Sequence, residues 1–420
     1  MQFKHAMSVL LLALALPALA QHVHKEGAKR RPPPLAMGAA FAPSGELWIV
    51  GLDDRQRLFV QTSGDEGRGW AAPRVLDSGA DKIAADGENR PKLAFGTKGE
   101  AVITYTEPLE RPYTGQIRML RSADAGQTFS APFTVHHDRQ LITHRFESVA
   151  FDALGTLHTL WVDKRDTEAQ AKAQAARAPA AVAAADNAAS AAGLAGRKAR
   201  VKSEYRGAAI YRNESKDGGL SFGPDIKLAD HSCECCRIAL APAPDGSLVA
   251  LWRHVFAPNE RDHAFAAVAA PRGDEPVRAS FDRWAIDACP HHGPGLAPAA
   301  AGGYHAVWFG DRAGASQVRY GQLDALGAPR GEARPLPDER AEHAAVQSAG
   351  SNVVIVWRSF DGQATAWRAW ISSDDGRNFT LKELGRSTED NDHPLLAKRG
   401  AQVFALWRTA SGVRVERIVP

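Results

Sequence analysis

Four stretches of the sequence share one pattern: SGDEGRGW at 63–70, SADAGQTF at 122–129, SKDGGLSF at 215–222 and SSDDGRNF at 372–379. Each reads Ser-x-Asp-x-Gly-x-x-aromatic. In such a turn the Ser and Asp side chains can accept hydrogen bonds from backbone N–H groups, and the Gly can adopt a left-handed conformation. The aromatic ring can pack beneath the next strand. We therefore expect four structural turns, whose aspartates take no part in catalysis.

A longer repeat surrounds these turns, with a period of about fifty residues. Its clearest part is a short segment of alternating apolar residues that often ends in Trp. Period-2 alternation and a high content of β-branched and aromatic residues predict strands rather than helices. The seven copies are Glu46–Val50, Glu100–Thr104, Leu157–Trp161, Leu248–Trp252, Tyr304–Trp308, Val353–Trp357 and Val403–Trp407.

The four turns are Asp boxes, and the chain resembles the sialidase-like superfamily of Asp-box (BNR-repeat) β-propellers, as a divergent member. The resemblance implies an all-β fold, a β-propeller with four-stranded antiparallel blades. Seven strand sets favour seven blades, whereas sialidases have six, so six is the alternative count. The last set has only three strands. We expect an N-terminal arm over residues 21–34 to supply the fourth and close the ring.

The N-terminus has the features of a cleavable secretory signal over residues 1–20. An apolar run, Val9–Leu16, follows a basic start, and Ala18-Leu19-Ala20 is a small-x-small cleavage pattern. We expect the mature chain to begin at Gln21 and to be periplasmic or secreted. No other stretch is apolar enough for a membrane helix, so we expect no membrane anchor.

One propeller is expected over residues 35–420. An Ala-rich, low-complexity segment at 167–203 is predicted to be an insertion in one loop. The formal net charge of +3 is too small to indicate a nucleic-acid partner. We expect a monomer.

Two stretches before neighbouring inner strands contain all four cysteines, as Cys-x-Cys-Cys and Cys-Pro-His-His. Both precede Leu-Ala-Pro, and aligned on it they match position by position. Thiolate and imidazole are ligands of copper and zinc. The sequence therefore predicts a soft-metal site, copper before zinc, formed by Cys233, Cys235, Cys236, Cys289, His291 and His292, with His254 and His263 as further candidates.

Other repeats carry polar pairs at like positions, namely His144-Arg145, Glu342-His343 and Asp392-His393. A disulfide framework is the competing interpretation, because exported proteins with an even number of cysteines usually oxidise them. Cys233 and Cys289 could bridge two blades in that case. The matching histidines favour metal, since a disulfide does not need them. The expected function is metal handling, delivery or uptake, with an outer-membrane transporter or a periplasmic metal carrier as partner.

The resemblance also implies an enzymatic alternative, an exo-sialidase-type glycoside hydrolase. Sialidases hold a substrate carboxylate with three arginines, and Arg90, Arg145 and Arg253 could mimic that triad. The Phe/Tyr-Arg-Ile-Pro motif that usually supplies the first arginine is absent. We therefore favour a non-enzymatic function. A non-catalytic propeller that binds carbohydrate or protein is a third reading, and the fold alone does not choose among them.

Overall fold

Antiparallel strands make up almost all of the structure, a computed structural model that describes residues 34–176, 207–271, 273–288 and 290–420. These residues belong to one unit, Pro33–Pro420. The predicted signal peptide, nearly all of the predicted arm at 21–34 and most of the predicted insertion at 167–203 lie outside the described residues.

Within this described part of the chain the strands form seven consecutive groups, which we number 1 to 7. Group 1 is β1 (Gly38–Phe41), β2 (Leu47–Leu52), β3 (Leu58–Ser63) and β4 (Arg74–Val75). Group 2 is β5 (Lys92–Phe95), β6 (Ala101–Pro108), β7 (Gly115–Ser122) and β8 (Phe133–Thr134). Group 3 is β9 (His144–Phe151), β10 (Leu157–Asp163), β11 (Ala208–Ser215) and β12 (Ile226–Ser232).

Group 4 is β13 (Ala239–Pro242), β14 (Leu248–Phe256), β15 (Glu260–Ala267) and β16 (Val277–Arg278). Group 5 is β17 (Gly295–Pro298), β18 (Tyr304–Arg312), β19 (Ala315–Leu323) and β20 (Pro329–Pro335). Group 6 is β21 (Glu342–Ala349), β22 (Asn352–Phe360), β23 (Thr365–Ser372) and β24 (Thr380–Ser387). Group 7 is β25 (Leu395–Arg399), β26 (Gln402–Thr409) and β27 (Gly412–Val419).

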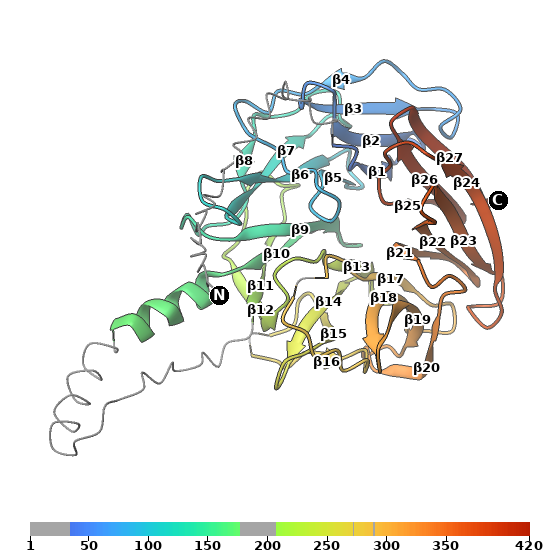
Figure 1. Ribbon diagram of the computed structural model, residues 1–420. Helices are drawn as coiled ribbons and strands as arrows, with labels where there is room; N and C mark the ends of the chain where they lie inside the picture. Colours follow the sequence, from blue (N-terminus) through green and yellow to red (C-terminus); the bar gives the residue numbers. More distant parts are fainter. Residues whose placement is uncertain (1–33, 177–206, 272, 289) are drawn as a thin grey trace, which may run out of the picture. The chain divides into compact units, whose positions relative to one another are not determined.

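Each group is an antiparallel meander, and the groups follow one another around a closed ring (Figure 1). The first strand of each group contacts the first strand of the next, and β25 contacts β1. One extra pairing, Ser232 with His254, joins groups 3 and 4 into a single sheet. Strand groups that radiate from such a ring of inner strands define a β-propeller. The expected all-β propeller fold is therefore confirmed.

The second strand of each group is buried on both faces because each sheet packs between two neighbours. The burial is complete along β2 and β10, and it explains why these strands read as apolar segments. Second strands also supply four of the largest fully buried side chains among the described residues, namely Trp161, Trp252, Trp357 and Trp407.

The Asp boxes are the turns between the third and fourth strands of groups 1, 2, 3 and 6. In the second box, Asp124 Oδ1 accepts a hydrogen bond from the N–H of Thr128 at 2.9 Å, and Ser122 Oγ accepts one from the N–H of Gly126 at 2.8 Å. Gly126 has φ 81°, which suits glycine. The four ring-bearing residues pack against core clusters: Trp70, Phe129, Phe222 and Phe379. These contacts are those of structural turns.

The Ala-rich stretch begins in the loop between β10 and β11 as a helix over residues 165–176. No helix in the described ranges has the length and apolar composition needed to cross a bilayer.

Candidate metal centre

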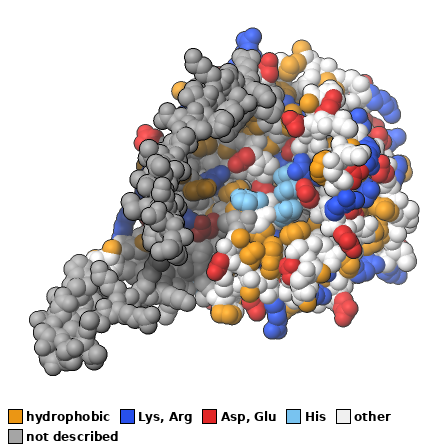
Figure 2. Space-filling view, in the orientation of Figure 1, with side chains coloured by type: hydrophobic (Ala, Val, Ile, Leu, Met, Phe, Trp, Pro, Cys, Tyr) orange, Lys and Arg blue, Asp and Glu red, His pale blue; other side chains and the backbone are white. Residues whose placement is uncertain are grey.

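Buried polar side chains gather where the chain enters the inner strands. Because the inner strands surround one axis, their entry segments meet near the centre of the ring. Histidine side chains gather near the middle of the face in Figure 2. The buried or half-buried residues in or just before these strands are Glu88, Asn89, Arg90, His144, Cys233, Cys235, Cys236, His292, His343, Asp392 and His393.

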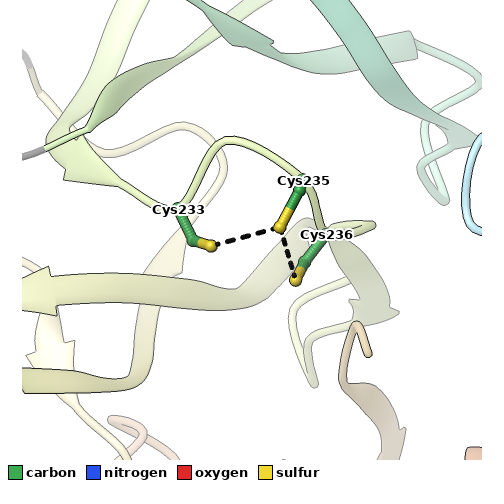
Figure 3. Close-up of side chains that lie close together, drawn as sticks. All are labelled: Cys233, Cys235 and Cys236. Carbon is green, nitrogen blue, oxygen red and sulfur yellow. Dashed lines mark hydrogen bonds between the residues drawn. The ribbon is translucent and has the colours of Figure 1, made fainter. Parts of the chain in front are cut away.

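Three of the predicted metal ligands lie together in the segment between β12 and β13. Cys233, Cys235 and Cys236 are buried, and their side chains point toward one another (Figure 3). The Sγ atoms of Cys233 and Cys235 are 3.5 Å apart, and those of Cys235 and Cys236 are 3.8 Å apart. All three sulfur atoms lie within 4.8 Å of one another, and no disulfide bond joins any two of them.

This spacing fits a shared metal ion better than a disulfide bond. A disulfide needs sulfur atoms about 2.05 Å apart. Thiolates around one tetrahedral ion at a metal–sulfur distance of about 2.3 Å are separated by about 3.8 Å. The two measured separations are close to that value. One ion could therefore contact all three sulfur atoms with little movement of the backbone.

Two arginines border the sulfur cluster. Arg261 Nη1 lies 3.4 Å from Cys233 Sγ. Arg253 is 1% exposed, and its Nη2 donates to the carbonyl oxygens of His292 and Phe309. Among the described residues neither guanidinium has a carboxylate partner within salt-bridge distance. A buried charge without a counter-charge is costly, so these arginines favour an anionic group beside them. Thiolates on a metal supply that negative charge.

Metal binding must displace protons from the cysteines. A hydrogen bond with Cys233, together with burial, raises the pKa of the Cys236 thiol, although Arg253 opposes the shift. Cys236 is therefore a thiol at neutral pH when no metal is bound. Its conversion to a thiolate requires the metal's charge.

Another candidate histidine, His263, is buried close enough to Cys233 for the two side chains to interact electrostatically. It is 1% exposed, and its Nδ1 lies 3.1 Å from Ser280 Oγ. Its Nε2 has no hydrogen-bond partner among the described residues. Burial and Arg253 hold the pKa of His263 well below its usual range, whereas Cys233 acts in the opposite direction. His263 is therefore neutral at pH 7, and the described ligand group within 4.8 Å contains the three cysteines without it.

The other predicted ligands are placed differently. Cys289 lies outside the described residues. His291 is exposed, and its φ of 55° is left-handed. His254 is buried and packs against Phe256, with ring centroids 4.4 Å apart.

His292 belongs to a stack of imidazole rings rather than to the sulfur cluster. Its ring lies 4.2 Å from the ring of His343, which lies 3.4 Å from the ring of His393, centroid to centroid. Burial lowers the pKa of all three, that of His292 to about 3, and the charges of nearby arginines add to the shift. Glu88 acts in the opposite direction on His292 and His343. The three rings are therefore neutral at pH 7.

Glu88 joins this stack, and sequence reasoning missed it. Its Oε1 lies 3.0 Å from His343 Nδ1 and 2.6 Å from Arg237 Nη1. Burial opposes its ionisation, but Arg237 and His343 hold the pKa of Glu88 well below its ordinary value. The available signal was its position, shortly before the second inner strand, where other repeats carry Cys or His.

Two of the three arginines proposed for a sialidase-like triad bond to other protein groups. Arg90 donates through both terminal nitrogens to Asp392, at 2.8 and 3.0 Å. Arg253 bonds to backbone carbonyls, as described above. Arg145 packs over Phe146 and has an acidic neighbour, Asp86, 4.0 Å away.

Solved structures of similar fold include carbohydrate-active enzymes. An ulvan lyase, a polysaccharide lyase, matches with a TM-score of 0.52 and 10% identity, over 92% of this chain and 93% of its own. The α-L-arabinofuranosidase Arb93A of Fusarium graminearum matches with a TM-score of 0.50 and 12% identity, over 84% of this chain and 94% of its own. The chain shares their propeller fold.

A mutant of the sialidase NanB from Streptococcus pneumoniae matches this propeller with a TM-score of 0.47 and 8% identity, over 93% and 92% of the two chains. No protein-family model matches the sequence, and no curated protein does. At these identities the likeness concerns the fold alone, so the function of this propeller must be argued from its own side chains.

Proposed function

We propose that this propeller binds a soft metal ion, copper(I) before zinc, through Cys233, Cys235 and Cys236. The observation that carries the proposal is the set of three buried sulfur atoms within 4.8 Å of one another. Thiolate ligands select copper(I) and zinc over harder ions. Arg253 and Arg261, which have no carboxylate partner among the described residues, match the negative charge that three thiolates would bring.

The biological role that fits such a site is metal handling, delivery or uptake in an exported protein. The site would be loaded in the periplasm or outside the cell, and a transporter or a metal carrier would be its partner. Binding should protect the thiols, because a metal-bound thiolate reacts slowly with oxidants. The role therefore requires no catalytic residue.

Metal content and thiol state test the proposal together. The mature chain purified from a periplasm should contain copper or zinc. One equivalent should be lost in the variant with Cys233→Ser, Cys235→Ser and Cys236→Ser. The matched control is His137→Ala, which alters an exposed histidine outside the sulfur cluster and should leave the metal in place. Protein without metal, in which these cysteines are oxidised, would overturn the proposal.

A sugar-active enzyme is the second candidate function, because two of the structural neighbours named above are a lyase and a glycosidase. Turnover of a fluorogenic sialoside, reduced by Arg145→Ala, would favour it. The bonds that Arg90 and Arg253 make within the protein favour the metal-binding function instead.

A further inference from the structure

A second cluster of potential ligands lies near the axis, with oxygen and nitrogen atoms instead of sulfur. The ligand atoms of Glu88, His343 and His393 lie within 4.8 Å of one another. They come from the entry to β5, from the start of β21 and from the entry to β25. Segments far apart in the sequence are thus brought to one point by closure of the ring.

Two nitrogen atoms of the imidazole stack have no hydrogen-bond partner among the described residues. His393 is 9% exposed, and its Nδ1 makes no hydrogen bond to any described residue. The same holds for Nδ1 of His292, at the other end of the stack. A buried polar atom without a partner costs about 1–3 kcal/mol. These nitrogens therefore indicate a ligand that completes their bonding.

The charges around the stack would admit a cation. Three arginines lie nearby, and each has a carboxylate partner: Arg90 with Asp392, Arg237 with Glu88 and Arg358 with Glu342. The imidazoles are neutral, which is the form that binds metal. The cluster therefore offers imidazole lone pairs and one carboxylate, and the positive charges of the nearby arginines are balanced by their carboxylate partners.

We propose that Glu88, His343 and His393 bind a divalent transition-metal ion such as zinc or copper(II), at a site separate from the cysteines. Two imidazole nitrogens and a carboxylate oxygen suit such borderline ions. Stacked rings direct their nitrogens in parallel, so the His393 ring must turn about its Cβ–Cγ bond to share an ion with His343. No hydrogen bond from Nδ1 of His393 to a described residue opposes that turn.

Cobalt(II) distinguishes the two sites because only sulfur ligands give it strong charge-transfer absorption. The mature full-length chain, titrated with cobalt(II), should bind two equivalents, of which one lacks that absorption. The variant His343→Ala with His393→Ala should lose the equivalent without charge transfer and keep the other. The matched control His137→Ala, which removes an exposed histidine outside both clusters, should keep both.

The opposite experiment removes the sulfur ligands. With Cys233, Cys235 and Cys236 changed to Ser, one equivalent of cobalt(II) without charge transfer should remain. Adding His393→Ala to this variant should reduce its affinity for cobalt(II) at least tenfold. Circular dichroism establishes that each variant is folded. A folded serine variant that binds no cobalt(II), or a folded double histidine variant that still binds two equivalents, would overturn the second site. If the unmutated chain binds cobalt(II) but shows no charge-transfer band, the result counts against the cysteine site only.

Discussion

Arg253 is the residue that links the interior of the propeller to the chemistry of the sulfur cluster. Its guanidinium is buried and bonds only to neutral groups among those described. Cys233 and burial raise the pKa of Cys236, whereas a hydrogen bond with Cys235 and the charge of Arg253 lower it. A fixed positive charge beside a thiol makes its deprotonation, and hence metal binding, more favourable.

We predict that Arg253→Gln weakens copper(I) affinity at pH 7 by about tenfold, the equivalent of one pKa unit. The physical reason is the loss of the charge that stabilises the thiolates. Competition with a copper(I) chelator of known affinity measures the effect. Arg408→Gln is the control, because Arg408 is also bonded to backbone carbonyls, those of Leu35 and Leu52. Equal affinities in the two variants would refute the role of Arg253.

Glu88 and Arg237 form a pair whose two charges depend on each other. The Glu88 side chain is 3% exposed and that of Arg237 is 23% exposed. Arg237→Met should destabilise the metal-free protein by about 2–4 kcal/mol, because it leaves a buried carboxylate without its cation. Chemical denaturation measures the loss. Adding Glu88→Gln should restore part of the stability, whereas additive losses would show that the pair is not coupled.

At the scale of elements, the turns and the second strands could be predicted from the sequence. The contact among the polar segments that precede the inner strands could not. The Asp-box pattern and the alternating apolar segments are local, so the sequence alone places them. The stack of His292, His343 and His393 depends on closure of the ring, which brings groups 5, 6 and 7 together at one axis. Glu88 arrives there from group 2, and no spacing along the chain indicates that contact.

The Asp boxes should contribute to stability and not to metal binding. Ser122 is buried, and its Oγ bonds the N–H of Gly126 and Asp124 Oδ1. Ser122→Ala should therefore cost about 1–2 kcal/mol in free energy of unfolding. The exposed Ser44 provides the control, since Ser44→Ala should change stability little. A change in metal stoichiometry in Ser122→Ala would contradict the separation between turn and site.

At the scale of the whole molecule, buried neutral histidines make stability depend on pH. The pKa is lowered, mainly by burial, in His136, His144, His263, His292, His305, His343 and His393. The unfolded chain takes up protons below about pH 6.5, while the folded chain does not until its lower pKa is reached, near 3 for His136 and His292.

This contribution is therefore fully present above pH 6.5 and is lost as the pH falls toward 3. Each such histidine can remove up to about 1.4 kcal/mol per pH unit in that window. The urea midpoint of the metal-free mature chain should fall steadily from pH 7 to pH 5. A midpoint that stays constant over this range would contradict the neutral, buried state of these histidines.

The central claim is that one soft metal ion binds to three cysteine sulfur atoms inside a propeller. X-ray absorption at the copper edge of the copper(I)-loaded mature chain tests it most directly. We predict a first shell of three sulfur atoms at about 2.3 Å. A first shell of only nitrogen or oxygen atoms, or a chain that takes up no copper while its cysteines are reduced, would contradict it.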